Sequence, residues 1–292
     1  MMKHAILAAL VAAPLLTTAQ KLPQPSPKGS VEQVIGLTTV KVEYNRPSMK
    51  GRVIFGDLVP YGKVWRTGAN LCTTIEFDGP VTLQGEPVKP GKYSLFTIPS
   101  EDTWVVILNR NTELWGAEDR KEEEDVLRVK AQRRKNGTPV ETLTFSFDAI
   151  GQDKAELGLR WEAMHIPLLI EADATEQSLQ NIKEALSKPD ADYRAYHGSA
   201  RFCLDRGIRQ EDALAWAQRS VTMERKYWNT YTLALAYASN GKMKEAVESA
   251  NEGMKLAQEA KDDTYVKMCK ARIDEWRPRV GTAAPATTKP TK

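Results

Sequence analysis

The stretch from Arg46 to Asn70 combines cationic and aromatic side chains with many prolines and glycines. An arginine presents a planar fork of donors that matches carboxylate, phosphate or sulfate groups, and an aromatic face stacks on a sugar ring. An asparagine amide supplies a donor and an acceptor together, as sugar hydroxyls require. The candidate ligand-binding residues are Arg46, Lys50, Arg52, Tyr61, Trp65, Arg66 and Asn70.

A structural role for the same residues is an open alternative. A long crossover between strands uses arginines to bind main-chain carbonyls, glycines for left-handed turns and an aromatic ring to close one end of a barrel. In that case Trp65 belongs to the core. The position of the guanidinium groups distinguishes the two interpretations, because they either converge on an open cavity or bind backbone oxygens.

Histidines are too few for most catalytic and metal sites. His4 lies in the leader and His197 in the helical half, which leaves His165 for the first domain. A nucleophilic triad has only this one base, and a zinc site with two or three histidines cannot form there. His165 alternates with apolar residues, so we expect it to face solvent or a hydrogen-bond partner. We expect no catalytic residue, no metal ion and no cofactor.

A metal-independent hydrolase that acts on envelope polysaccharide or peptide is the alternative function. Such an enzyme needs two acidic groups, or a nucleophile with a base, in one cleft. Asp57, Glu162 and His165 are the groups that would have to meet beside the 46–70 stretch. A scaffold without any pocket is a third possibility.

Length and charge restrict the partners. The chain has 292 residues, which suits two domains, and its 41 basic and 38 acidic residues nearly balance. Nucleic-acid binding requires a concentrated basic face, and the sequence contains none. We therefore expect no nucleic-acid partner.

Residues 1–19 are typical of a signal peptide. A short basic start precedes an apolar run, and small residues allow cleavage after Ala19. The run is too short to cross a bilayer, and no later segment is long enough, so we expect no membrane span. The mature protein is then periplasmic or secreted. The proline-rich residues 20–29 predict an extended linker.

Residues 30–172 alternate between apolar and polar side chains, which predicts about ten short strands. Turn-forming residues separate them at 78–80, at 90–91, at Asn136–Gly137 and at Gly151. No helical pattern intervenes, so the expected fold is an antiparallel β-sandwich or barrel, jelly-roll-like in form. The charged runs at residues 121–125 and 133–135 are expected to be solvated.

Residues 173–279 change to a helical period and predict six helices, at 178–187, 191–205, 211–225, 229–240, 244–261 and 264–276. Gly207 recurs as Gly241, and Ala213 and Ala217 recur as Ala246 and Ala250. This segment resembles tetratricopeptide repeats, whose stacked helix pairs commonly offer a groove to a partner protein. Residues 280–292 are expected to form a disordered tail.

The three cysteines, Cys72, Cys203 and Cys269, are far apart. A disulfide-stapled exported domain would carry more of them. We expect buried thiols, and a bridge between Cys203 and Cys269 is the alternative.

Several long segments of the β half resemble one family. They are NRPSMKGRVIFGDLVPYGKVWRTGAN, KPGKYSLFTIPSEDTWVVILN, Leu114-Trp115-Gly116, DVLRV from Asp125, and LRWE from Leu159. Together they resemble domain-of-unknown-function family 2911, an uncharacterised family of exported bacterial β-domains. The resemblance implies a β fold and an exported protein, and it implies no activity. The function expected from the sequence is an exported binding or scaffold protein, with a small polar or anionic ligand, such as a glycan, on the β-domain.

Overall fold

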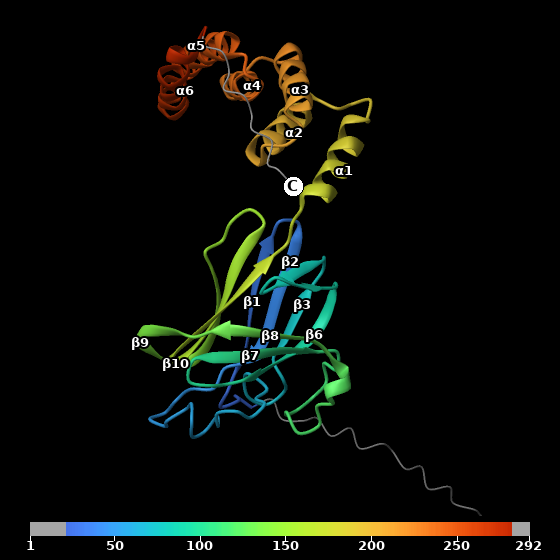
Figure 1. The fold of residues 1–292 in the computed structure, drawn as a ribbon, viewed down its shortest axis with the longest axis vertical. Coiled ribbons are helices and arrows are strands. Elements are labelled where there is room, and N and C mark those ends of the chain that lie inside the picture. The colour runs from blue at the N-terminus through green and yellow to red at the C-terminus, as the bar shows by residue number, and fades with distance from the viewer. Residues whose placement is uncertain (1–21, 282–292) are drawn as a thin grey trace, which may run out of the picture. The chain divides into compact units, whose positions relative to one another are not determined.

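The computed structural model describes residues 22–281 (Figure 1). The expected signal peptide with its cleavage point, and residues 282–292 of the expected tail, lie outside this range. The chain divides into two compact units between Ala174 and Thr175. We call them the β unit and the helical unit. Within the described range, no helix combines the length and the apolar character needed to cross a membrane.

The β unit consists of strands in two antiparallel sheets. A six-stranded sheet has the order β1-β2-β3-β6-β7-β8, and a four-stranded sheet has the order β5-β4-β10-β9. The strands are β1 (Lys28–Ile35), β2 (Thr38–Asn45), β3 (Thr74–Phe77), β4 (Val81–Leu83), β5 (Glu86–Val88), β6 (Gly91–Ile98), β7 (Thr103–Asn109), β8 (Asp125–Gln132), β9 (Arg134–Asp148) and β10 (Lys154–Glu171). Strand β1 begins two residues before the expected start of the domain at Ser30.

One apolar core lies between the two sheets. It includes Val40 and Val42 of β2, and Leu157 and Leu159 of β10. In each pair the two side chains point inward because they are two residues apart on one strand. The β unit is therefore the expected antiparallel sandwich. Its strand order is not that of a jelly roll. Consecutive strands lie side by side in the six-stranded sheet, as β1-β2-β3 and β6-β7-β8, whereas the consecutive strands of a jelly roll mostly alternate between its two sheets.

Strand β10 joins two segments that the alternation treats as separate strands. The buried residues change phase between Trp161 and Met164, and the register with β9 shifts at this point. Glu162 has a left-handed φ of 52°, as one residue of a bulge commonly does. The bulge restores the inward direction of the apolar side chains.

The prediction of a turn at Asn136–Gly137 is wrong. Strand β9 runs through these residues, and the chain changes direction at Arg133, between β8 and β9. The turns expected at residues 78–80, at Pro90 and at Gly151 lie between strands. An Asn-Gly pair favours a tight hairpin turn, which requires the two flanking strands to pair with each other. Here the strands on either side of the change of direction, β8 and β9, belong to different sheets, so no hairpin forms.

The helical unit contains the six expected helices, with bounds shifted by a few residues. They are α1 (Thr175–Leu186), α2 (Tyr193–Arg206), α3 (Gln210–Met223), α4 (Tyr227–Ser239), α5 (Met243–Glu259) and α6 (Asp263–Trp276). Gly207 and Gly241 follow α2 and α4 in left-handed conformations, with φ of 66° and 73°. Ala213 and Ala246 are fully buried at equivalent places in α3 and α5, where a small side chain lets helices approach closely.

A series of buried hydrogen bonds connects the two helix pairs. The Asn229 side chain of α4 donates to Ser220 Oγ of α3 at 3.0 Å, and Ser220 Oγ donates to the Tyr193 carbonyl of α2 at 2.8 Å. Asn229 also donates to the Glu224 carbonyl at 2.7 Å. Because buried polar groups are costly without partners, this chain fixes the alignment of α2, α3 and α4.

Candidate ligand-binding site

The connection between β2 and β3 closes one end of the sandwich (Figure 1). Ile54, Phe55 and Val59 are buried, and the Trp65 ring stacks on Trp161 with centroids 5.9 Å apart. The Trp65 indole N–H donates to the Gly68 carbonyl at 3.2 Å. Trp65 therefore has the packing role that the structural interpretation gave it.

Arg46 and Arg52 bind neighbouring chain segments. Arg46 Nε donates to the Leu143 carbonyl at 3.2 Å, and its Nη2 donates to Thr144 Oγ1 at 3.0 Å. Arg52 donates to the main-chain oxygens of Met49 and Ser48 at 2.9 and 2.7 Å. These guanidinium groups fasten the connection to β9 and to itself, as the structural interpretation expected.

The remaining candidates lie apart from one another. Lys50 is exposed, and its main-chain amide donates to Glu141 Oε1 at 2.9 Å. Tyr61 is also exposed, and its ring lies against Gly56. The Arg66 side chain is half-buried, and its Nε has no hydrogen-bond partner in the described part of the chain. Asn70 alone of the seven candidates lines the pocket that the next paragraphs describe.

A pocket of about 370 Å³ opens on the outer face of the six-stranded sheet. Four of its neighbouring strands contribute to it, together with the β2–β3 and β7–β8 connections. Its lining includes Lys28, Glu43, Asn70, Lys92, Thr112 and Trp115. The pocket thus combines an aromatic ring, an amide, a hydroxyl and charges of both signs.

Three lysines surround Glu43, and two of them, Lys28 and Lys92, line the pocket with it. Lys92 Nζ lies 2.9 Å from Glu43 Oε2, and Lys28 and Lys41 Nζ lie 3.1 and 3.6 Å from Oε1. Hydrogen bonds from Lys92 and Lys28 lower the pKa of Glu43 to about 2. The carboxylate is therefore ionised at neutral pH, and the lysines leave an excess of positive charge around it.

The exposed ring of Trp115 is held by its neighbours in the chain. Leu114 is buried with Cys72, Phe96 and Ile107 in a small apolar cluster outside the main core. The Cys72 thiol donates to the Gly116 carbonyl at 3.4 Å. With its neighbours anchored on both sides, Trp115 is held outward, 62% exposed, at the wall of the pocket.

Asn45, Asn70, Lys92 and Trp115 of the pocket lining lie in segments that carried the family resemblance in the sequence. The model of the family described as "Protein of unknown function (DUF2911)" matches residues 26–170. The β unit is similar to this family over nearly its full length. The match extends from just before β1 to Ile170 near the end of β10, and it covers every residue of the pocket lining except Gln24. No curated protein and no solved structure is detectably similar to the chain.

Lys121, Glu122 and Glu123 of the charged run are exposed as expected, but Asp125 at its end is not solvated. Arg120 Nη2 lies 2.6 Å from Asp125 Oδ2, and these side chains are only 5% and 8% exposed. Asn109 donates to Asp125 Oδ1 at 2.9 Å and to the Lys121 carbonyl at 3.0 Å. The buried ion pair fixes the C-terminal half of the connection that carries Trp115, whereas Glu122 is exposed.

The three cysteines are free and buried, as expected for independent thiols. Burial raises the pKa of Cys72 to about 12, which keeps its thiol protonated at neutral pH. Cys72 lines the pocket, but a protonated buried thiol is a poor nucleophile. Its contribution is therefore to hold the Trp115 loop.

His165 lies on the opposite face from Met164, as expected, but it is not solvated. The residue is only 8% exposed, and its Nε2 has no hydrogen-bond partner within residues 22–281. Glu156 Oε1 lies 3.9 Å from this nitrogen. Burial, helped by the nearby Arg160, lowers the pKa of His165, so the ring is neutral at physiological pH.

Sequence reasoning missed most of the pocket. Lys28, Glu43 and Lys92 lie in three strands that are distant in sequence, and only the strand order brings them together. Trp115 had one sequence signal, its place in the Leu114-Trp115-Gly116 segment of the resemblance.

Proposed function

We propose that the β unit binds a small anionic saccharide in the pocket between Trp115 and the Glu43 cluster, and that the protein is an exported binding protein. The observation that carries this proposal is the exposed Trp115 ring beside a positively charged cluster in one pocket. An exposed indole offers a flat apolar face on which a sugar ring can stack, and the charged groups beside it can bind an anionic substituent.

The lining supplies each type of contact that a sugar acid needs. The apolar face of a pyranose ring stacks on the Trp115 indole, and the amide of Asn70 exchanges hydrogen bonds with hydroxyl groups. A carboxylate on the ligand interacts with Lys28 and Lys92, whose combined charge exceeds that of Glu43. Glu43 accepts hydrogen bonds from hydroxyl groups because it stays ionised.

We also propose that the helical unit is tetratricopeptide-like and docks a protein partner. Helix α4 begins 34 residues after α2, and α5 begins 33 residues after α3. Left-handed glycines and buried alanines recur at the same places in both pairs. These equivalences support a repeat, and stacked helix pairs offer an extended surface for a peptide or protein.

A hydrolase is less well supported by the same pocket. Among the described residues that line it, Glu43 is the single carboxylate, and the lysines keep it ionised. Acid-catalysed glycoside hydrolysis requires a second carboxyl group with a raised pKa. Glu162 does lie beside the β2–β3 connection, where its Oε2 accepts from the Phe55 amide at 3.4 Å, but it is not among the residues of this pocket.

Isothermal titration tests the proposal. The chain is titrated with matched pairs of neutral and carboxylated oligosaccharides, and we expect heat of binding for the carboxylated member. Trp115→Ala should abolish it, and Lys92→Gln should weaken it. Lys154→Gln is the control, because this exposed lysine of β10 is not among the residues that line the pocket. Binding that survives Trp115→Ala, or no binding to any member, contradicts the proposal.

A further inference from the structure

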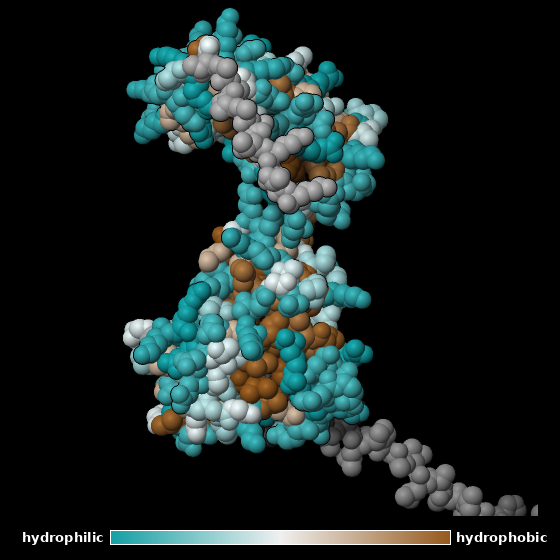
Figure 2. Space-filling model, in the orientation of Figure 1, coloured by the Kyte–Doolittle hydropathy of each residue, from teal (hydrophilic) through white to brown (hydrophobic). Residues whose placement is uncertain are grey.

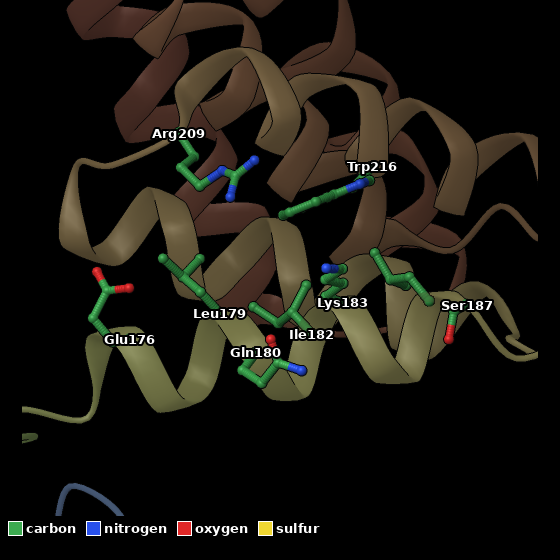
Figure 3. Close-up of a pocket in the computed structure, with 9 residues that line it drawn as sticks. Glu176, Leu179, Gln180, Ile182, Lys183, Ser187, Arg209 and Trp216 are labelled. Carbon is green, nitrogen blue, oxygen red and sulfur yellow. The ribbon is translucent and has the colours of Figure 1, made fainter.

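A groove of about 520 Å³ separates α1 from α3 in the helical unit. Leu179 and Ile182 of α1 point across it toward Trp216 of α3 (Figure 3). Apolar residues are visible between these helices on the surface of the unit (Figure 2). The groove has apolar residues along its floor and charged residues at its rim, a combination that suits an amphipathic helix from another chain.

Helix α1 is incompletely packed within its own chain. None of its residues is fully buried. Leu179, Ile182 and Leu186 form an apolar ridge that is only half-buried, with Leu179 packed against the core of α2 and α3. Their spacing of three and four residues is that of the contact positions in a coiled coil. The pairs α2–α3 and α4–α5 instead bury alanines completely. The ridge of α1 therefore has the pattern of a helix that packs against a further helix.

Two charged residues of α1 lie along one side of its apolar ridge. Glu176 and Lys183 are seven residues apart, so they lie on the same flank of the ridge two turns from each other. Neither forms an ion pair with any residue in the range 22–281, and both line the groove. The other cation of the groove, Arg209, is paired with Asp212 of its own helix at 2.6 Å.

We propose that a second copy of this chain occupies the groove, with the two α1 helices antiparallel about a two-fold axis. Antiparallel packing places Glu176 opposite Lys183 of the partner subunit, and the symmetry repeats this pair at the other end. The Leu179–Ile182–Leu186 ridges then interdigitate, and Trp216 is covered. One helix that carries both charges at this spacing is complementary to itself, which is why a second copy is the occupant. This interface is separate from the saccharide pocket of the β unit.

Sedimentation equilibrium with charge-reversal variants tests the dimer. The wild-type chain should show a concentration-dependent monomer–dimer equilibrium. Glu176→Lys and Lys183→Glu should each weaken it roughly tenfold, because both seams then bring like charges together. An equimolar mixture of the two variants should restore dimers, because every pair in the heterodimer is again attractive.

Glu184→Lys is the matched control, since Glu184 lies on the opposite side of α1 and bonds with Gln180 of the same helix. It should leave the equilibrium unchanged. Circular dichroism confirms that each variant folds. A wild-type chain that is monomeric at all attainable concentrations overturns the proposal. So does a dimer that neither reversal weakens, or a mixture of variants that stays monomeric.

Discussion

The main-chain amide of Cys72 donates to the carbonyl of Leu114 at 3.0 Å. This hydrogen bond joins the β2–β3 connection, which ends at β3, to the β7–β8 connection, which precedes β8. The residues next to these two, Leu71 and Trp115, are both exposed and both line the pocket. The proposed saccharide site thus depends on two loops that are far apart in sequence and directly bonded in the fold.

Removal of Trp115 should leave the β unit folded. We expect Trp115→Ala to change the free energy of unfolding by about 0.5 kcal/mol or less, because its ring is mostly in solvent. Trp104→Ala is the comparison, since Trp104 is fully buried and its loss should cost ~3–5 kcal/mol. Chemical denaturation measures both. A large loss of stability in Trp115→Ala would mean that the ring is structural.

The Glu43 cluster should make stability depend on pH in the acid range. The pKa of Glu43 is about 2 in the folded chain, against 4.5 for the free group. The cluster therefore stabilises the fold above pH 4.5, and this stabilisation is lost as the pH falls from 4.5 toward 2. Thermal melts of wild type and Glu43→Gln at several pH values measure it. Equal slopes for the two proteins in this window would contradict the prediction.

His197 should produce a second pH dependence, in the helical unit. Burial, together with Arg201, lowers the pKa of His197 to about 4 from 6.5. Its ring packs edge-on against Trp228, with centroids 4.5 Å apart. The unfolded chain binds this proton more readily, so the free energy of unfolding falls as the pH decreases from 6.5 to 4. His197→Phe should reduce that slope in melts followed by far-ultraviolet circular dichroism, and an unchanged slope would exclude His197 as its source.

Alanine substitutions at two glycines, one inside α2 and one directly after it, should change the stability of the helical unit in opposite directions. Gly207 has a left-handed φ of 66°, so Gly207→Ala should destabilise the helical unit by ~1 kcal/mol. Gly198 lies inside α2, and a Cβ there would meet no atom within 4 Å. Gly198→Ala should therefore stabilise the unit by ~0.5–1 kcal/mol. Melting temperatures that shift in the same direction would count against the assigned cap.

Alternation is clearest in a strand with one covered face. Strand β2 is an example, with Val40, Val42 and Tyr44 inward. Strand β6 has no such alternation, because Ser94 to Thr97 are all buried. Phe96 lies on its outer face, where the loop at Leu114 covers it. A strand covered on both faces loses the period-two signal, so sequence alone could not place it.

The site was harder to predict than the fold. Cations in the 46–70 stretch were visible in the sequence, but nothing there shows that Arg46 and Arg52 bind main-chain oxygens. Nothing in the sequence marked the pocket lysines as binding residues, because exposed lysines are common on strands. Their meaning comes from β1, β2 and β6 sharing one sheet, which places Lys28 and Lys92 on either side of Glu43.

The most direct test follows the Trp115 indole N–H by nuclear magnetic resonance, with the resonance assigned by Trp115→Phe. The chain is titrated with a carboxylated oligosaccharide and, separately, with its neutral counterpart. We predict that the Trp115 signal shifts progressively with the carboxylated sugar, while that of buried Trp104 stays in place. A Trp115 signal that does not move at saturating sugar would contradict the proposed site.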